Sequence, residues 1–196
     1  MLSTAEQYHS PANYLALERV AESKHEFFDG EMFRMSGGTL LHSQLAGNVI
    51  FEFGKGLEDS PCRVLTSDMR IKLPTGLYTY PDASIVCDHP QFEDGHRDVL
   101  LNLIVIVEVL SPSTESYDRG KKFEHYRSCP SLRDYLLISQ DRVFVEHFSR
   151  QADTDQWLLT TWNSLSDAVL VAALNARLPL RGIYARVDVP SLSEQN

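Results

Sequence analysis

The sequence has few cysteines and no long hydrophobic run. Its three cysteines, Cys62, Cys87 and Cys129, are widely spaced and form no Cys-x-x-Cys pair. This spacing argues against a disulfide framework or a zinc cluster and favours a reducing cytoplasm. No apolar segment approaches the roughly 18 residues that cross a bilayer, and residues 1–6 lack the basic start and apolar stretch of a signal peptide. We therefore expect a cytoplasmic protein with no membrane partner.

Positive charge is also scarce, because 18 basic residues face 27 acidic ones and the formal net charge is −9. A protein that grips nucleic acid through many phosphates normally presents a basic face, so this balance argues against tight, non-specific DNA binding. Residues 119–133 are a local exception, with five cations against one acid, Glu124. Such a stretch is usually a solvated helix face, but it could also receive a phosphate backbone.

Several motifs of well-known enzyme classes are missing. The sequence contains no Gly-Lys-Ser/Thr phosphate loop, no His-Glu-x-x-His zinc motif and no Gly-x-Ser-x-Gly nucleophile turn. With 196 residues, of which 43% are hydrophobic, the chain fits one globular domain over 1–196. We expect a core over about 11–186 and a frayed tail at 187–196.

The order of predicted elements indicates the fold class. A hairpin is expected around Asp29-Gly30, and helical periodicity or capping residues predict helices over 11–22, 39–57, 115–127 and 180–185. Strand patterns cover 63–67, 69–73, 83–87, 101–110, 135–139, 143–148 and 157–161, while 169–174 fits a strand or a helix. This order predicts an α/β (α+β) fold with a mixed central β-sheet flanked by helices, an N-terminal hairpin and additional C-terminal strands.

One carboxylate, Glu108, interrupts the most apolar run of the chain, 103–110. Burying an ionised carboxylate in an apolar sheet costs several kcal/mol or more unless a cation or a strong donor compensates it. One interpretation is a divalent metal shared with Asp82, which follows Pro81 at the start of a predicted strand. Magnesium accepts two carboxylates together with waters or a backbone carbonyl. The alternative is a structural ion pair with a strand cation, for which the candidates are Arg63, Arg70 and Lys72.

The predicted helix after this strand carries Asp118, Lys122 and Tyr126 at i, i+4 and i+8, which places them on one stripe. If the helix returns over the end of the strand, Lys122 reaches the neighbourhood of Glu108. There it could orient water and stabilise charge that develops on a phosphate ester.

Together these residues carry a resemblance to a known group. Pro81-Asp82 followed by Glu108-x-Leu110 is similar to the signature of the PD-(D/E)XK nuclease superfamily. The motifs Phe27-Phe-Asp-Gly-Glu, His42, Val107-Glu-Val-Leu-Ser-Pro-Ser-Thr, Asp118-Arg-Gly-x-Lys122 and Tyr126 resemble the Uma-two family of endonucleases, over about 14–184. The resemblance implies a restriction-endonuclease-like fold with a mixed four-stranded central sheet. It also implies Mg²⁺-dependent phosphodiester hydrolysis, in which Mn²⁺ can substitute, acting on nucleic acid such as DNA, with a homodimer as a common arrangement.

Site roles follow from the same resemblance. Asp82 and Glu108 would hold the metal, Lys122 would orient water, and Glu26 would complete the acidic cluster. Residues expected to contact substrate are His42, Arg119 and Tyr126.

One departure from the pattern bears on activity. The superfamily lysine lies two positions after the acid on the same strand, where this chain has Leu110, so the lysine role moves to Lys122 on the helix. Two alternatives therefore stay open. One is a nuclease-fold binding or assembly protein that does not cleave, and the other is an acid–base enzyme that uses Glu26 and Glu108 as a metal-independent pair.

Overall fold

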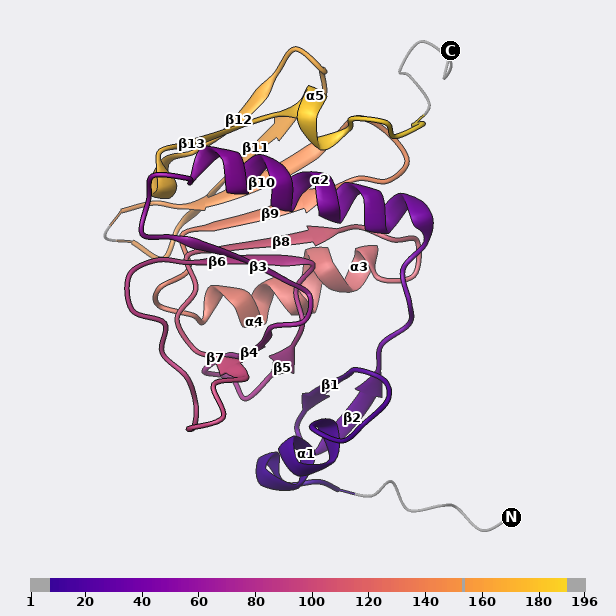
Figure 1. Cartoon of the computed structure of the whole chain (residues 1–196), viewed down its shortest axis with the longest axis vertical. Helices are drawn as coiled ribbons and strands as arrows, with labels where there is room; N and C mark the ends of the chain where they lie inside the picture. Colours follow the sequence, from indigo (N-terminus) through magenta and orange to yellow (C-terminus); the bar gives the residue numbers. More distant parts are fainter. Residues whose placement is uncertain (1–7, 153, 190–196) are drawn as a thin grey trace.

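Two β-sheets organise the computed structural model, which describes residues 8–152 and 154–189 (Figure 1). The larger sheet has six strands in the order β11-β10-β9-β8-β6-β3. Their bounds are Trp157–Trp162 for β11, Val145–Arg150 for β10, Asp134–Ile138 for β9, Val105–Val109 for β8, Ala83–Val86 for β6 and Arg63–Thr66 for β3. Only β8 and β9 run parallel in this sheet. The mixed α+β fold is thus confirmed, whereas the four-stranded sheet is a correction, because β3 and β11 extend the sheet at its two edges.

The second sheet has five strands in the order β2-β1-β5-β4-β7. Its strands are β2 (Glu31–Arg34), β1 (His25–Phe28), β5 (Tyr78–Thr79), β4 (Arg70–Lys72) and β7 (Val99–Leu100). Asp29 and Gly30 join β1 to β2 with φ of 49° and 87°, which is the backbone that a two-residue hairpin turn requires. The sequence pattern missed β5 and β7, because two-residue strands are too short to show an alternation.

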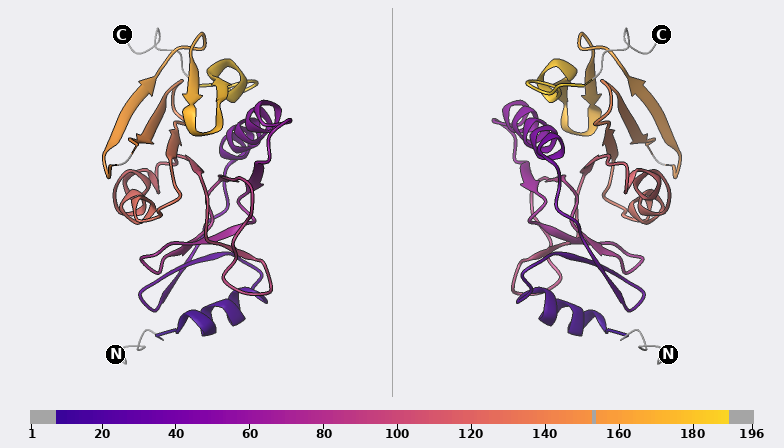
Figure 2. Two further views of the ribbon diagram at one scale, coloured as in Figure 1. Left: turned by 90° about the vertical axis from the view of Figure 1, so that its left-hand side faces the viewer. Right: turned by 90° about the vertical axis from the view of Figure 1, so that its right-hand side faces the viewer.

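Two helical segments cover opposite faces of the six-stranded sheet, as the side views of Figure 2 show. On one face lies α2 (Leu40–Gly56), whose N-cap is Thr39, within one residue of the predicted start of this helix. On the other lies the helix between β8 and β9, made of α3 (Glu115–Tyr117), a π-helical turn over Asp118–Lys122, and α4 (Phe123–Arg127). Parallel neighbours need such a crossover, so the β8–β9 pairing fixes where this helix lies.

Alternation along β8 decides which layer each of its side chains enters. Val105, Val107 and Val109 pack in the hydrophobic core beneath α2. Ile106 packs in the other core, beneath α3 and α4, and Glu108 shares that side because successive strand residues point to opposite faces. All five residues of the strand are buried.

The remaining elements lie at the two ends of the chain. The first helix, α1, spans Pro11–Glu18 with Ser10 as N-cap, and it ends before the predicted residue 22 because the Glu18 carboxylate accepts the backbone N–H of His25 (2.8 Å). Near the C-terminus, β12 (Ala168–Val171) pairs with β13 (Ala176–Pro179), which the pattern missed, and α5 spans Leu180–Ile183. Residues 187–189 were expected to be frayed, but Val187 and Val189 pack against the core. The rest of the predicted tail lies outside the described residues.

Two further predictions need correction. The strand expected over 101–110 begins only at Val105, because Asn102 turns the preceding chain through hydrogen bonds to the backbone of Gln91 and His89.

Cys62 and Cys87 form a disulfide, in contrast to the expectation of unpaired cysteines. They flank β3 and β6, whose register pairs the adjacent residues 63 and 86, a proximity that a separation of 25 positions does not reveal. Within the described part of the chain, no helix has the length and apolar character to cross a membrane.

Candidate active site

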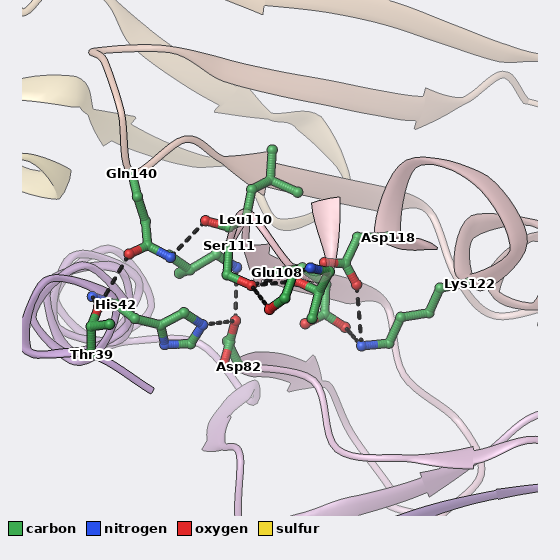
Figure 3. A network of polar contacts seen from close by, with 12 residues as sticks. Thr39, His42, Asp82, Glu108, Leu110, Ser111, Asp118, Lys122 and Gln140 are labelled. Carbon is green, nitrogen blue, oxygen red and sulfur yellow. Dashed lines mark hydrogen bonds and ion pairs between the residues drawn. The ribbon is translucent and has the colours of Figure 1, made fainter. Parts of the chain in front are cut away.

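Asp82 and Glu108 lie side by side at one edge of the six-stranded sheet. β6 and β8 are antiparallel neighbours, with Ala83 opposite Val107, so the next pair in register brings Asp82 beside Glu108. The backbone N–H of Val109 donates to Asp82 Oδ2 (2.7 Å). Figure 3 shows the side chains of Asp82, Glu108 and Lys122 in one network of polar contacts. The two carboxylates therefore come from adjacent strands, as their spacing in the sequence predicted.

Lys122 is the cation that compensates Glu108. Its Nζ lies 2.8 Å from Glu108 Oε1, and both side chains are nearly buried, with 7% and 5% exposed. The Tyr126 hydroxyl donates to the same oxygen (2.5 Å). Two of the strand cations proposed as alternative partners bind elsewhere, since Arg70 donates to Tyr80 and Lys72 pairs with Glu93. The third, Arg63, is exposed on the edge strand β3.

Two more carboxylates approach the same ammonium. Asp118 Oδ1 and Glu26 Oε1 each lie 3.4 Å from Lys122 Nζ. Glu26 comes from the five-stranded sheet and also accepts a hydrogen bond from the Thr79 hydroxyl. Asp118 Oδ1 is buried and has no hydrogen-bond partner, although Lys122 attracts it electrostatically. With Asp82, this group of four acids (the carboxylate cluster) contains more negative charge than one ammonium neutralises.

Burial and charge shift the pKa values of the central pair. Burial raises the pKa of Glu108 to about 8, with Lys122 lowering it and the nearby Asp118 and Asp82 raising it. For Lys122, burial lowers the pKa, but Glu108, Glu26 and Asp118 outweigh burial and raise it well above the usual value. Lys122 is therefore a permanent ammonium in this protein, and the carboxylate cluster is short of positive charge.

A π-helical turn carries Asp118 and Lys122 into the site. Turns of this kind are rare and occur frequently at functional sites. Here the Tyr135 hydroxyl, which comes from β9, donates to the backbone oxygen of Asp118 (3.1 Å). The widened turn thus has a polar partner inside the core, and it keeps both charged side chains on the Glu108 side of the helix.

The start of α2 forms another wall of the site. Thr39 caps the helix by accepting the backbone N–H of His42 (3.2 Å). This cap directs the ring toward β6, where His42 Nε2 lies 3.2 Å from Asp82 Oδ2. The hydrogen bond to Asp82 raises the pKa of His42, burial opposes the rise, and the charges of Asp82 and Glu108 add to it.

These walls enclose a cavity of about 420 Å³. Parts of both sheets and both helical layers line it, namely 33–39, 108–109 and 111–114, together with residues 26, 42, 80, 82, 117, 118, 122 and 140. In Figure 1 the start of α2, the end of β8 and α3 lie at the same edge of the molecule.

Comparison with known proteins identifies the family. Residues 11–181 match the model of Uma2, whose description reads "Putative restriction endonuclease". The chain belongs to the Uma2 family. Two uncharacterized proteins of Synechocystis sp., slr1290 and sll1609, are each 36% identical, over 89% and 76% of this chain and 90% and 84% of their own lengths.

A solved structure supports the fold assignment. It is described as a putative nuclease belonging to DUF820 from Anabaena variabilis, and it superposes with a TM-score of 0.73 at 15% identity. The match covers 89% of this chain and 96% of that one. The expected Uma2 membership and the nuclease-like fold are both confirmed.

Not every residue expected at the site reaches the cavity. Glu26, His42, Asp82, Glu108 and Lys122 all line it. Tyr126 does not, because its side chain is wholly buried and its hydroxyl is bound to Glu108. It can position that carboxylate but cannot touch a substrate in this structure.

Arg119 also lies away from the cavity, so its expected contact with substrate finds no support. It is one position after Asp118 and points to another side of the helix, where it pairs with Glu115 and with Glu146 (2.6 Å). These two carboxylates already neutralise its charge.

Asp118 and Gln140 are among the cavity residues to which the sequence analysis assigned no role. Asp118 was placed on the helical stripe, and its i, i+4 spacing from Lys122 was the signal for a paired acid. Gln140 gave no signal in the sequence, because a single glutamine shortly after a strand belongs to no motif or periodic pattern. Its amide donates to the backbone oxygen of Leu110 (2.6 Å), which ties the ends of β8 and β9 together beside the cavity.

The residues of this Uma2 member fit a hard divalent cation. All four members of the carboxylate cluster are oxygen donors, and Asp118 Oδ1 is buried without a hydrogen bond. Within 8–152 and 154–189, no three His, Cys, Asp or Glu side chains are already arranged as a set of metal ligands. Mg²⁺ suits such a site, because one or two carboxylates plus waters commonly suffice for it.

Proposed function

We propose that this protein is a Mg²⁺-dependent endonuclease that hydrolyses phosphodiester bonds in DNA. The observation that carries the proposal is the convergence of Asp82, Glu108 and Lys122 at one cavity, from two adjacent strands and the crossover helix. The Uma2 description and the nuclease name of the structural neighbour support a nuclease-like function.

Asp82 and Glu108 are the residues that would hold the metal. Their carboxylates are adjacent and line the cavity, and Mn²⁺ would serve in place of Mg²⁺ because it accepts the same oxygen ligands. A metal bound there would polarise a phosphoryl oxygen and lower the pKa of a bound water. Both carboxylates need to be ionised to bind it, and the positive charge would lower the raised pKa of Glu108.

Lys122 serves in this scheme as a fixed donor of hydrogen bonds. Because its pKa is raised well above the usual value, its ammonium does not take a proton from water, but it can orient water and stabilise negative charge on the phosphate. In the hydrolysis, a water oxygen bonds to phosphorus and the bond to one ester oxygen breaks. His42 and Glu26 lie on two sides of the same cavity and are placed to assist in positioning.

The position of Lys122 favours cleavage over a protein that only binds. Leu110 is buried in the core beneath α4 and cannot replace the superfamily lysine, which motivated the binding or assembly alternative. Lys122 supplies an ammonium 2.8 Å from Glu108 instead. The same contact weakens the metal-independent acid–base alternative, because Lys122 lies within ion-pair distance of both Glu26 and Glu108.

A nicking assay on supercoiled plasmid tests the proposal. We expect nicking in Mg²⁺ or Mn²⁺, none in EDTA, and loss of at least about 100-fold in rate for Asp82→Ala and Glu108→Ala, on the scale of losing a main electrostatic contribution. The exposed Asp59, in the turn that follows α2, provides the matched control Asp59→Ala, which should nick like the parent. Calorimetric titration with Mg²⁺ shows in parallel whether the protein binds the metal, which distinguishes an endonuclease from a protein that binds Mg²⁺ without cleaving.

Three outcomes would count against the proposal. Nicking that survives Asp82→Ala or Glu108→Ala in a pure preparation would refute the residue assignment. Mg²⁺ binding without nicking of any nucleic acid would favour the binding or assembly protein. Turnover of a small metabolite in EDTA would favour the acid–base enzyme.

A further inference from the structure

An exposed aromatic side chain stands beside the carboxylate cluster. Phe33 lies on β2, at the edge of the five-stranded sheet, and 47% of it is exposed to solvent. It nevertheless lines the cavity that contains Glu108 and Lys122. Leaving a phenyl ring half exposed forgoes part of the free energy that its burial would provide.

The hairpin register explains how Phe33 comes to this place. Phe33 lies directly opposite Glu26 in the β1–β2 pairing, and residues opposite each other in an antiparallel pair point to the same face, with Cβ atoms about 4.5–5.5 Å apart. The next pair, Phe27 and Met32, points the other way and packs in a separate core. Phe33 is therefore next to an acid that contacts Lys122.

The charges around the cavity are unsuited to gripping a duplex. Proteins that hold double-stranded DNA commonly neutralise about 6–10 phosphates with basic side chains. Here the lysine and arginine side chains that line the cavity are Lys122 and Arg34. Lys122 is buried among carboxylates, and the net charge of the chain is −9. Arg119, which heads the basic stretch of the sequence, is neutralised by two glutamates.

Stacking offers a way to hold a strand that does not depend on many phosphate contacts. A base stacked on an aromatic side chain contributes about 1–3 kcal/mol, with little dependence on which base it is. In a duplex the faces of the bases are covered by their neighbours, so a protein can stack on a base only where it is unpaired. The cavity of about 420 Å³ is at the lower end of the range for small-molecule pockets, so it suits one nucleotide better than a duplex.

We infer that the substrate strand is single-stranded or locally unpaired DNA, and that Phe33 holds a base next to the scissile phosphate by stacking. This inference rests on the proposed function, since it places the reacting phosphate at Asp82 and Glu108. It adds the class of substrate and a residue that selects it. A half-exposed ring at the cavity beside Glu26 and the shortage of positive charge around it are the two observations that carry it.

Binding of fluorescent oligonucleotides tests the inference. Anisotropy would be measured for a labelled single strand and for a hairpin duplex of the same sequence, with Ca²⁺ as an oxygen-binding cation in place of Mg²⁺. We expect the single strand to bind at least tenfold more tightly than the duplex. Phe33→Ala should weaken binding of the single strand by about 5- to 150-fold, which is the stacking contribution converted at 1.4 kcal/mol per tenfold, whereas Phe33→Tyr should keep it.

The matched control is Phe51→Ala. Phe51 is another exposed phenylalanine, 64% exposed, on α2 and outside the cavity lining, so its loss should leave binding unchanged. Melting temperatures of all variants would show that they fold.

The inference is overturned if the duplex binds as tightly as the single strand, if neither binds, or if Phe33→Ala behaves like Phe51→Ala. The proposed function fails on different results. Single-strand binding that depends on Phe33, without cleavage in Mg²⁺, would overturn the endonuclease and keep the inference. Mg²⁺-dependent cleavage, together with single-strand binding that Phe33→Ala leaves unchanged, would keep the endonuclease and overturn the inference.

Discussion

Replacing Lys122 with methionine should destabilise the fold strongly, because the ammonium compensates several buried carboxylates at once. Asp118 and Glu108 are 3% and 5% exposed beside it. Removing one partner of a buried ion pair typically costs about 3–5 kcal/mol, since the other charge is left uncompensated. For a domain of this size that corresponds to a melting temperature about 6–20 °C lower.

A double variant separates the ion pair from side-chain packing. In Lys122→Met with Glu108→Gln, no carboxylate is left at position 108, so above pH 8, where Glu108 of the parent is ionised, we expect the double variant to recover about 1–3 kcal/mol relative to the single one. The control is Lys121→Met, because Lys121 is the exposed neighbour of Lys122 and should change stability by less than about 0.5 kcal/mol.

The pH dependence of stability gives an independent check. Burial raises the pKa of Glu108 from its usual 4.5 to about 8 in the folded protein, so its contribution to stability is complete below pH 4.5 and is lost as the pH rises through about 8. Without Lys122 this pKa rises further, so Lys122→Met should continue to lose stability above pH 8, where the loss in the parent levels off.

Thermal denaturation in EDTA measures each of these effects. If Lys122→Met melted within about 1 °C of Lys121→Met, the ammonium would not compensate buried carboxylates, because a broken buried ion pair shifts the melting temperature by more. A double variant no more stable than the single one would lead to the same conclusion.

Three other predictions concern residues around the site. Tyr126→Phe removes the hydroxyl that donates to Glu108; it should cost about 1.5–3 kcal/mol in urea denaturation, as for hydrogen bonds to charged groups, and weaken Mg²⁺ binding in calorimetry. Reducing the Cys62–Cys87 disulfide should lower stability by about 2–4 kcal/mol, an effect that the double serine variant should reproduce without reductant. Thr39→Ala removes the N-cap of α2 and should lower the free energy of unfolding by about 1 kcal/mol in urea denaturation.

The sequence was most informative where one residue contradicted its surroundings. Glu108 in an apolar run required a compensating group, and the spacing to Asp82 indicated an adjacent strand, which the β6–β8 pairing confirms. Helical spacing brought Lys122 to the same place. Local helical geometry determines only how Lys122 lies relative to Asp118. Asp82 and Glu108 are about as far apart in the sequence as Cys62 and Cys87, and their pairing was predicted from the residue types and from the expected order of the strands.

Features that depend on contacts across the fold could not be predicted in this way. The disulfide depends on the register of β3 and β6, and the neutralisation of Arg119 depends on Glu146, which is 27 positions away on another strand. The π-helical turn at Asp118 has its polar partner, Tyr135, on a strand that follows the helix. A pattern of residue types along one segment contains no information about such partners.

The hairpin of β1 and β2 joins the rest of its sheet where Phe27 pairs with Tyr78. Tyr14 packs against both rings, and none of these three aromatic residues lines the cavity. Glu26 and Phe33 lie on the opposite face of the hairpin, so a change in the tilt of the hairpin would carry both of them together. A substitution at Tyr14, Phe27 or Tyr78 that altered this tilt would therefore move two cavity residues, although none of these three side chains faces the cavity.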